Sequence, residues 1–289
     1  MPVSELCRSA LRPIWRSTVK PVIPFVQCAR RYRRVFGRWP NLRHPQTFSE
    51  RLLQKILWDR NPRLTQFADK VRVRDYVADR IGHAYLTTLY AVVSRPEDIA
   101  ALSLPSAFVM KPNHLCGAMK VVREGERIDR QELATLAATW LPRNHYYLLN
   151  EWAYKDIPPR VLFEELLVAP DGHLDDFKFW CFHGEPRLLQ LDRDRFRRHR
   201  RNYYDMAGTL LPLRVMYDPF PGPFALPPNF ATMIELARRL SEGVDFLRVD
   251  LYNVGGRIVF GELTNYPEGG QGRCEPASWD AELGRYWAS

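Results

Sequence analysis

The chain is poor in cysteine and lacks the patterns that cysteine-based folds require. Five cysteines occur among 289 residues, at positions 7, 28, 116, 181 and 274, and no two are spaced as C-x-x-C. An odd number without that spacing argues against a disulfide framework and against structural zinc. We therefore expect a reducing, cytoplasmic environment.

Long apolar runs, internal repeats and low-complexity segments are also missing. No apolar stretch approaches the length of a transmembrane span, and prolines and arginines interrupt the first one, so no signal peptide is visible. Because 46% of the residues are apolar, the chain can still bury a substantial core, as one large domain or a few small ones.

Acidic residues are scarce at the start of the chain. Residues 1–45 hold ten Lys and Arg against the single acid Glu5, a net charge of +9, whereas the remainder balances at 32 against 32. Aromatic residues stand among these bases, a mix that suits anionic lipid headgroups or a polyanionic glycan. Segment 8–38 carries nine of the bases, Arg8, Arg12, Arg16, Lys20, Arg30, Arg31, Arg33, Arg34 and Arg38, among Trp15, Phe25, Tyr32 and Phe36, with Trp39 just beyond.

Two interpretations of this basic extension remain open: peripheral contact with an anionic membrane at its inner face, without insertion, or a solvated tail packed partly on the body. Pro13, Pro21 and Pro24 are expected to prevent one continuous amphipathic helix. No nucleic-acid partner is expected, because no helix-turn-helix, zinc-finger or RNA-recognition pattern accompanies the charge.

Helical and strand patterns alternate without the regular rhythm of a doubly wound sheet, which favours an α+β fold with antiparallel sheets. A capping box, Thr47-Phe-Ser-Glu50, predicts a helix through Trp58. Further helices are expected at Leu64–Arg80, from Arg95, at Asp129–Trp140 and at Phe230–Ser241. Strands are expected within Tyr85–Val93 and at Ala107–Pro112, Met119–Val122, Arg160–Leu167, Asp175–His183, Arg187–Asp192, Phe246–Tyr252 and Ile258–Thr264.

The last two strands form a hairpin that carries an acid on each strand. Alternation places Arg248 and Asp250 on one face of the first strand, and Glu262 and Thr264 on one face of the second. The two acids share a face only if the loop has an odd number of residues, for instance a three-residue turn with Gly255 or Gly256 in the left-handed conformation.

Two carboxylates brought together in this way need a partner. At about 4 Å they repel by roughly 4 kcal/mol at an effective dielectric near 20, so the pair requires protonation or a cation, such as a divalent ion with oxygen ligands. The alternative is an ordinary salt-bridged sheet face, in which Asp250 pairs with Arg248 and Glu262 with a distant base.

Three other segments place charge at the ends of apolar strands. Lys111 precedes a small-residue loop with Gly117 and Ala118 that ends at Lys120; its backbone could approach phosphate oxygens, or it is a structural turn. The Glu164-Glu165 pair could accept hydrogen bonds from an adenine amino group or ribose hydroxyls, or be one exposed acid beside a salt-bridged neighbour.

Asp176 and Lys178 share a side of their strand, where the lysine either reaches the surface or binds a buried anion.

Two groups have less certain roles. The segment Asp192–Arg201 holds six arginines in ten positions, which suits an acidic sugar polymer, a carboxylate substrate or a solvated loop. The histidines His114, His145, His183 and His199 do not stand at a recognisable metal-ligand spacing, and we interpret them as incidental.

In this order, the patches resemble the ATP-grasp superfamily and, more closely, the TupA-like ATP-grasp proteins, named for teichuronopeptide synthesis in bacterial surface polysaccharide pathways. The resemblance covers about residues 40 to 265. It rests on Asn41-Leu-Arg-His-Pro-Gln-Thr-Phe-Ser-Glu50, Phe67-Ala-Asp-Lys-Val-Arg-Val-Arg74, Phe108-Val-Met-Lys-Pro-Asn-His114, Phe163-Glu-Glu-Leu166, Asp176-Phe-Lys-Phe-Trp-Cys-Phe-His-Gly-Glu-Pro186, Arg248-Val-Asp-Leu-Tyr252 and Phe260-Gly-Glu-Leu-Thr264.

The resemblance implies two α+β subdomains with antiparallel sheets that grip ATP and Mg²⁺, after a helical basic extension. The implied division is 1–45 for the extension, 46–105 for an N-terminal helical or α+β region, 106–159 for the small subdomain with the phosphate loop, and 160–289 for the large subdomain with the metal hairpin.

The resemblance also implies roles for individual residues. Lys111 and Lys178 would contact the ATP phosphates, with Lys120 and Gly117 near the phosphate loop. Glu164 would meet the adenine, assisted by Glu165, and Asp176 the ribose. Asp250 and Glu262 would be magnesium ligands, and Arg248 would stabilise a tetrahedral intermediate.

One position departs from the family pattern. The superfamily usually shows Glu-x-Asn, whereas this chain has Glu262-Leu-Thr264-Asn265, so either Thr264 or a water fills the third ligand position, or Asn265 turns inward.

Three functions follow as hypotheses. The leading one is an ATP-dependent carboxylate-amine ligase in surface polysaccharide and cell-envelope biosynthesis, acting through an acyl phosphate on an acidic sugar or polysaccharide precursor and an amine or amino acid. The second is a kinase for a glycan or small molecule. The third is a non-catalytic protein that binds polyanions or membrane surfaces.

Overall fold

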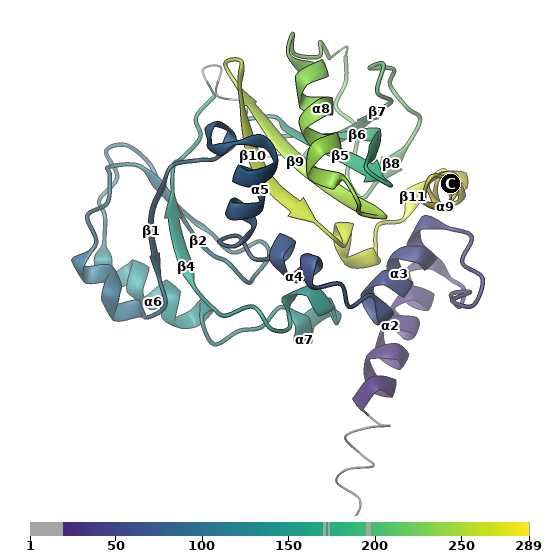
Figure 1. Ribbon diagram of the computed structural model, residues 1–289, viewed down its shortest axis with the longest axis horizontal. Helices are drawn as coiled ribbons and strands as arrows, with labels where there is room; N and C mark the ends of the chain where they lie inside the picture. Colours follow the sequence, from purple (N-terminus) through teal and green to yellow (C-terminus); the bar gives the residue numbers. More distant parts are fainter. Residues whose placement is uncertain (1–19, 170–171, 173, 195–197, 223, 289) are drawn as a thin grey trace, which may run out of the picture.

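The computed structural model of the chain describes residues 20–288, apart from 170–171, 173, 195–197 and 223 (Figure 1). The α-helices are α2 (Lys20–Phe36), α3 (Phe48–Trp58), α4 (Pro62–Ala68), α5 (Val73–Ile81), α6 (Arg130–Trp140), α7 (Tyr146–Leu149), α8 (Phe230–Ser241) and α9 (Ser278–Ala288). Short 3₁₀-helices are η2 (His83–Tyr85), η3 (Pro96–Ala101), η4 (Trp152–Tyr154) and η5 (Pro267–Gly270).

The strands form two antiparallel sheets of four and five strands and one two-stranded ribbon, as expected for an α+β fold. They are β1 (Leu89–Val93), β2 (Phe108–Pro112), β3 (Lys120–Val122), β4 (Val161–Glu164), β5 (Asp176–Phe182), β6 (Glu185–Arg193), β7 (Arg200–Tyr204), β8 (Arg214–Val215), β9 (Phe246–Val254), β10 (Arg257–Thr264) and β11 (Cys274–Glu275).

The four-stranded sheet, here sheet A, has the order β1-β4-β2-β3. Its core is formed with α6, whose buried Leu133, Ala137 and Trp140 belong to one cluster with Phe108 and Phe163 of the sheet. Asp129 caps this helix by accepting hydrogen bonds from two backbone N–H groups of its first turn. Sheet A takes β4 from the range predicted for the large subdomain, so the two sheets do not divide at residue 160.

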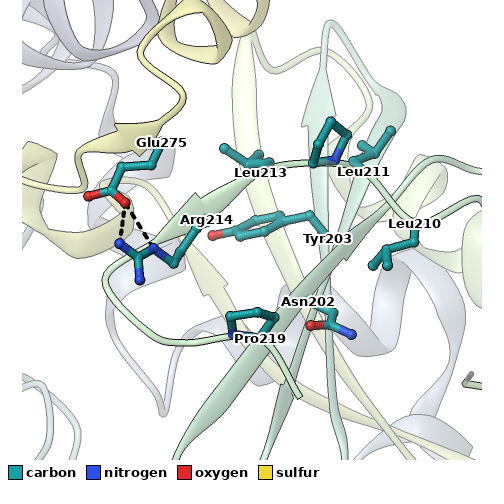
Figure 2. A pocket seen from close by; sticks show the side chains of 9 residues that line it. Asn202, Tyr203, Leu210, Leu211, Leu213, Arg214, Pro219 and Glu275 are labelled. Atoms are coloured by element: carbon teal, nitrogen blue, oxygen red, sulfur yellow. Dashed lines mark hydrogen bonds and ion pairs between the residues drawn. The ribbon is translucent and has the colours of Figure 1, made fainter. Parts of the chain in front are cut away.

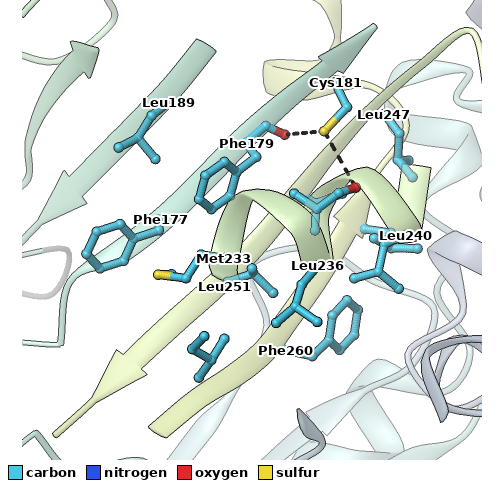
Figure 3. Close-up of a cluster of buried hydrophobic side chains, with 14 of the residues drawn as sticks. Phe177, Phe179, Cys181, Leu189, Met233, Leu236, Leu240, Leu247, Leu251 and Phe260 are labelled. Carbon is cyan, nitrogen blue, oxygen red and sulfur yellow. Dashed lines mark hydrogen bonds between the residues drawn. The ribbon is translucent and has the colours of Figure 1, made fainter. Parts of the chain in front are cut away.

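The five-stranded sheet, here sheet B, has the order β10-β9-β5-β6-β7 and buries one face beneath α8 and α5. Figure 3 shows this apolar cluster, in which Phe177, Phe179 and Cys181 of β5 pack with Met233, Leu236 and Leu240 of α8. Because side chains alternate along a strand, the intervening Asp176, Lys178 and Trp180 point to the other face. Packing against α8 thus determines which side chains of β5 lie on the opposite face, where they can contact a ligand.

A second core covers one end of that other face. Phe48 of α3 and Trp287 of α9 pack against Trp180, Phe182 and Phe246 of sheet B. The sequence patterns did not predict α9.

Helices α9 and α3 are joined at the beginning of α3. Asp280 accepts hydrogen bonds from the Ser49 backbone N–H at 2.9 Å and from its hydroxyl at 2.6 Å. A Cβ at Gly284 would lie 2.3 Å from the backbone oxygen of Gln46, so only glycine permits this approach.

The prediction of one helix over Leu64–Arg80 is wrong. The segment forms two helices, α4 and α5, with a break at Asp69. The Asp69 carboxylate accepts the Val71 backbone N–H at 2.9 Å and the Asn113 side-chain amide at 2.8 Å. An aspartate that binds nearby backbone N–H groups competes with the helix for them, and this one also attaches the break to the end of β2.

The expected effect of the prolines on the extension is wrong for two of them, because α2 includes Pro21 and Pro24. Pro21 is the second described residue of α2, and Pro24 lies inside the helix, where a proline removes a backbone hydrogen bond but does not end the helix here. Pro13 and the basic residues Arg8, Arg12 and Arg16 lie outside the described residues.

The described cysteines, at 28, 116, 181 and 274, are all free thiols. Among residues 20–288 as described, none of the helices has the length and apolar composition that a membrane crossing needs.

The predicted capping box of α3 is confirmed, and its Glu50 does more than close the box. Its carboxylate is 1% exposed and accepts the backbone N–H groups of Asn41 at 3.0 Å, Gln46 at 3.0 Å and Thr47 at 3.3 Å. It also pairs with Arg38. Burial alone would raise the pKa of Glu50, but these N–H groups and Arg38 hold it below the usual 4.5.

We predict that Glu50→Gln lowers the free energy of unfolding by about 2 kcal/mol at neutral pH, because a charged acceptor of several hydrogen bonds is lost. A depressed pKa contributes stability above the unfolded value, and that contribution disappears as the pH falls below 4.5. Urea unfolding should therefore show the two proteins converging in acid. Glu97→Gln, at a 66% exposed side chain, is the matched control and should behave as the wild type; an equal loss there would contradict the prediction.

Candidate functional site

Six polar residues come together on the face of sheet B that α8 leaves uncovered. Strand register pairs Lys178 with Asp250, Asp250 with Glu262, and Arg248 with Thr264. Asp176 stands on the same face, one alternation along β5 from Lys178. We call this set, Asp176, Lys178, Arg248, Asp250, Glu262 and Thr264, the polar face of sheet B.

The two hairpin acids share this face, but not for the reason expected from the sequence. The loop has two residues, Gly255 and Gly256, both with positive φ (57° and 91°), so the prediction of an odd-length turn is wrong. The extra residue is instead a β-bulge at Gly261, where the register shifts between Phe260 and Glu262.

The bulge requires glycine. A Cβ at Gly261 would lie 3.0 Å from the Asp250 backbone oxygen and 3.0 Å from the Tyr252 ring.

Asp250 is the centre of the polar face. Its carboxylate is 1% exposed, and Arg248 donates to both oxygens at 2.8 Å while the Lys178 ammonium donates at 2.5 Å. Lys178 also donates to Asp176 at 2.5 Å. Burial raises the pKa of Asp250 to about 6, despite the two cations that oppose the shift. This is a buried ion network in which each charge depends on the others.

Arg248 also connects Asp250 to the second strand. Its guanidinium donates to Glu262 at 3.2 Å and to the Thr264 hydroxyl at 3.0 Å, and that hydroxyl lies 3.3 Å from Glu262. Asp250 therefore pairs with Arg248, as the salt-bridge alternative proposed, and Glu262 also pairs with this arginine. The Glu262 side chain remains 44% exposed.

Thr264 and Asn265 lie in different surroundings. Thr264 is on the polar face, whereas the Asn265 amide donates to the Leu64 backbone oxygen at 2.8 Å and is 3% exposed. Asn265 thus attaches the end of β10 to α4.

The oxygen donors of this face are chemically suited to a hard divalent cation. Asp250, Glu262 and Thr264 supply two carboxylates and a hydroxyl. The described residues contain no group of three or more His, Cys, Asp or Glu side chains arranged to hold a metal, so the protein alone would not fill the coordination shell of an ion. Magnesium typically takes one or two protein carboxylates and completes its shell with water and substrate phosphates. The donor set fits a metal that arrives with a phosphate ligand.

On sheet A, the residues predicted to meet the nucleotide are also paired. Lys111 forms an ion pair with Glu164, which accepts a hydrogen bond from Thr87 at 3.1 Å and lies 3.8 Å from Arg74. Thr87 and Arg74 had no role at the site predicted from the sequence, because neither is a charged residue at the end of a predicted apolar strand.

Glu165 has partners on both sheets. It accepts the Thr88 backbone N–H at 3.0 Å and pairs with Arg257 of β10 at 2.6 Å. The Arg257 guanidinium holds the pKa of Glu165 below its usual value. This ion pair links the end of β4 in sheet A to sheet B.

The loop between β2 and β3 presents an open backbone. Gly117 has φ +72° and no atom within 4 Å of where its Cβ would be. Lys120, at the end of this loop, pairs with Glu132 of α6 at 2.6 Å.

Tyr154 of η4 contacts the loop between β2 and β3. Its hydroxyl is 3.0 Å from the Cys116 sulfur, and burial, together with the charges of Cys116, Glu151 and Glu262, holds its pKa well above 10. No motif marks this tyrosine in the sequence.

The arginine-rich segment is partly a strand. Arg201 is buried in β7. It donates two hydrogen bonds to Asp192, at 2.5 and 3.0 Å, and one to Glu268 at 2.8 Å. Arg193 is likewise bound to Asp175 at 2.9 and 2.7 Å. Arg195 and Arg197 lie outside the described residues. The Arg201 pair is buried and the Arg193 pair is partly exposed, and both arginines are bound to acids of the fold, so the proposed polymer contact would have to use the others.

The histidines have structural contacts as well. His114 lies 3.0 Å from the Asn113 side-chain oxygen, His145 3.5 Å from Glu151, His183 2.9 Å from the Trp287 backbone oxygen and His199 3.4 Å from Asp192.

A cavity of about 390 Å³ lies beside β7 and β8, away from the predicted site residues. Figure 2 shows Tyr203, Leu211 and Leu213 around it, with the Arg214–Glu275 ion pair at one side. None of the residues predicted to bind nucleotide or metal lines it.

Comparison with known proteins gives a family. A family model described as TupA-like ATP-grasp matches residues 47–288, which is most of the chain. No match to the chain is found among curated proteins.

Similar solved structures include the ATP-grasp ligase PsnB with its minimal precursor (14% identity, TM-score 0.40, 71% of this chain and 55% of that one). Others are D-alanine–D-alanine ligases, from Bacillus anthracis with ATP (13%, 0.41, 70% and 55%) and from Helicobacter pylori (14%, 0.42, 77% and 60%). The chain spans somewhat more than half the length of each of these structures.

We predict that Lys178→Met lowers the free energy of unfolding by about 3 kcal/mol or more, because it removes the cation that binds two buried carboxylates, Asp176 and Asp250. The double variant Lys178→Met with Asp250→Asn should recover part of this loss, since it removes one of those charges. Urea unfolding measures both. Lys120→Met, whose partner is half exposed, is the control and should cost under about 1 kcal/mol. A double variant less stable than Lys178→Met would refute the charge-balance explanation.

Proposed function

This chain belongs to the TupA-like ATP-grasp family, and from that membership we propose that it is an ATP-dependent carboxylate-amine ligase. The observation that carries the proposal is the polar face of sheet B, where Lys178, Arg248, Asp250 and Glu262 form one ion network in which the Glu262 side chain and the neighbouring Thr264 are partly exposed. A network of alternating charges can rearrange around a triphosphate, because phosphate oxygens compete with carboxylates for the same cations.

We assign the nucleotide to the region between this face and the end of sheet A. The Gly117 backbone, Lys111 and Lys120 would meet the phosphates from the loop side, and Lys178 from sheet B. Glu164 and Glu165 would accept hydrogen bonds from the adenine, and Asp176 would lie nearest the ribose. The Glu165–Arg257 ion pair supports this placement, because it connects the end of β4 in sheet A to β10 of sheet B.

Asp250 and Glu262 would hold Mg²⁺, with Thr264 as a further oxygen donor. Bound there, the metal would offset the negative charge of the triphosphate. Arg248 contacts all three of these residues, so it would keep them in place and also lie beside the reacting group.

The proposed reaction has two steps. A substrate carboxylate oxygen attacks the γ-phosphorus of ATP, the bond to ADP breaks, and an acyl phosphate forms. An amine then attacks the acyl carbon, phosphate leaves, and the amine loses a proton to give an amide. Arg248 is suited to stabilise the oxyanion of the second step, because its charge is held rigidly by Asp250.

For the substrates, we propose an acidic sugar or polysaccharide precursor and an amine or amino acid, within surface polysaccharide synthesis. The support is the family itself, whose name refers to teichuronopeptide synthesis. If this is correct, incubation with ATP, Mg²⁺ and a suitable pair should release ADP and phosphate in equal amounts and form an amide.

We predict that Arg248→Lys lowers kcat by at least about a hundredfold in this assay, since the loss of one oxyanion donor typically costs this much. Arg238→Lys, on the far face at α8, is the control and should retain full activity. Product mass spectrometry measures the amide. Failure of every uronic acid and amino acid pair would contradict the ligase assignment, and a phosphorylated product resistant to hydroxylamine would indicate a kinase instead.

We predict opposite effects for the two neighbouring residues at the end of β10. Thr264→Val should raise the Mg²⁺ concentration needed for half-maximal thermal stabilisation by ATP about tenfold, with little change in the stability of the free protein. Asn265→Ala should leave that concentration unchanged and lower the melting temperature of the free protein, because its bond to Leu64 is lost. Differential scanning fluorimetry across Mg²⁺ concentrations measures both. The reverse result would place Asn265 at the metal.

A further inference from the structure

Helix α2 buries one side, and its other side has no partner among the described residues 20–288. Cys28, Ala29 and Tyr32 are buried against the body, where the Tyr32 hydroxyl lies 3.1 Å from that of Ser49. Figure 1 shows α2 extending outward from α3 at the edge of the molecule. The buried side of this helix is therefore part of the fold, whereas packing does not explain the residues on its exposed side.

The unpartnered side of α2 is a stripe of arginines. Arg30, Arg33 and Arg34 are exposed, and their spacing of three and four residues places them together on the helix surface. They lie away from the buried Cys28 and Tyr32. No acidic residue occurs between positions 20 and 46, so nothing nearby in the sequence neutralises them.

Two other arginines of this segment have structural roles. Arg31 donates to the backbone oxygens of Leu148 and Leu149, at 3.1 and 3.0 Å, and Arg38 pairs with Glu50. Within the described part of the chain, no such hydrogen bond or ion pair is found for Arg30 or Arg34. The fold thus uses Arg31 and Arg38 and leaves the stripe free for an anionic partner.

An exposed aromatic ring accompanies the stripe. Arg33 lies over the Trp39 ring, 4.9 Å from its centroid, and Trp39 is 54% exposed. Phe25 is not part of the stripe, because it shares the side of Cys28 and Tyr32 and lies with its ring centroid 6.4 Å from that of Trp58. Large aromatic rings beside arginines are typical of the boundary between lipid headgroups and acyl chains, where one end of the ring is apolar and the other wet.

We propose that the outer side of α2, with Arg30, Arg33, Arg34 and Trp39, binds the surface of an anionic lipid bilayer. Each arginine gains from the negative surface potential, and the tryptophan inserts its ring at headgroup depth. A soluble polyanion would satisfy the charge but would not use an exposed aromatic ring of this kind. Attachment is peripheral, through charge and an interfacial ring, and it does not depend on the reaction proposed above.

The test is sedimentation of the full chain with vesicles. Vesicles of phosphatidylcholine containing phosphatidylglycerol should bind the wild type, and vesicles of phosphatidylcholine alone should not. The variant R30Q/R33Q/R34Q should bind about a hundredfold more weakly, and salt should weaken wild-type binding. The variant R123Q/R127Q/R143Q removes the same charge from exposed positions elsewhere and should bind as the wild type.

Trp39→Ala distinguishes a bilayer from a soluble polymer. It should weaken vesicle binding severalfold without changing the binding of polygalacturonate, a soluble polyanion. Absence of vesicle binding, an equal loss in the control variant, or vesicle binding unchanged by Trp39→Ala would each overturn the proposal. Melting temperatures of all variants, expected to match the wild type, exclude a loss of folding as the cause.

Discussion

The Asp250 carboxylate, buried between Arg248 and Lys178, is the constraint on which the rest of the structure depends. A buried charge is tolerated only when its partners are fixed, so β5 and β9 must keep the register that places Lys178 opposite Asp250. That register in turn assigns Phe177, Phe179 and Leu251 to the apolar face under α8. The ion network and the hydrophobic core are thus two consequences of one alignment.

The second strand of the hairpin reaches this network through a single extra residue. Without the bulge at Gly261, the side chains of β10 beyond it would exchange faces, and Glu262 and Thr264 would enter the core while Leu263 faced Arg248. The bulge therefore makes a two-residue glycine turn compatible with two acids on the same face. The turn joins the two strands, and the shift of one residue at Gly261 then places Glu262 on the face of Asp250.

Much of this arrangement follows from the sequence, because period-2 alternation is a local property. The pairing of faces along β5 and β9, the capping box of α3, and the bounds of α8 all come from patterns of a few residues. The position of the extra residue in the hairpin cannot be predicted in this way. Gly261 within the strand and Gly255-Gly256 at the turn are equally good candidates for irregular backbone. Tyr154, Arg74 and Thr87 were also beyond reach, because their significance lies in contacts across more than ten residues of chain. The break at Asp69 belongs to the same class, since it depends on Asn113.

The contact between α9 and the beginning of α3 has a consequence for synthesis on the ribosome. Ser49 and Asp280 are 231 positions apart, and the close approach of Gly284 to Gln46 brings the last helix against one of the first. The core of Phe48, Trp180 and Phe246 is closed by Trp287, which lies in the last turn of α9. While the nascent chain is still in the exit tunnel, these aromatic surfaces have no cover. The second core of sheet B can therefore close only after α9 has been synthesised and has left the exit tunnel. Until then its aromatic side chains are exposed and could bind chaperones.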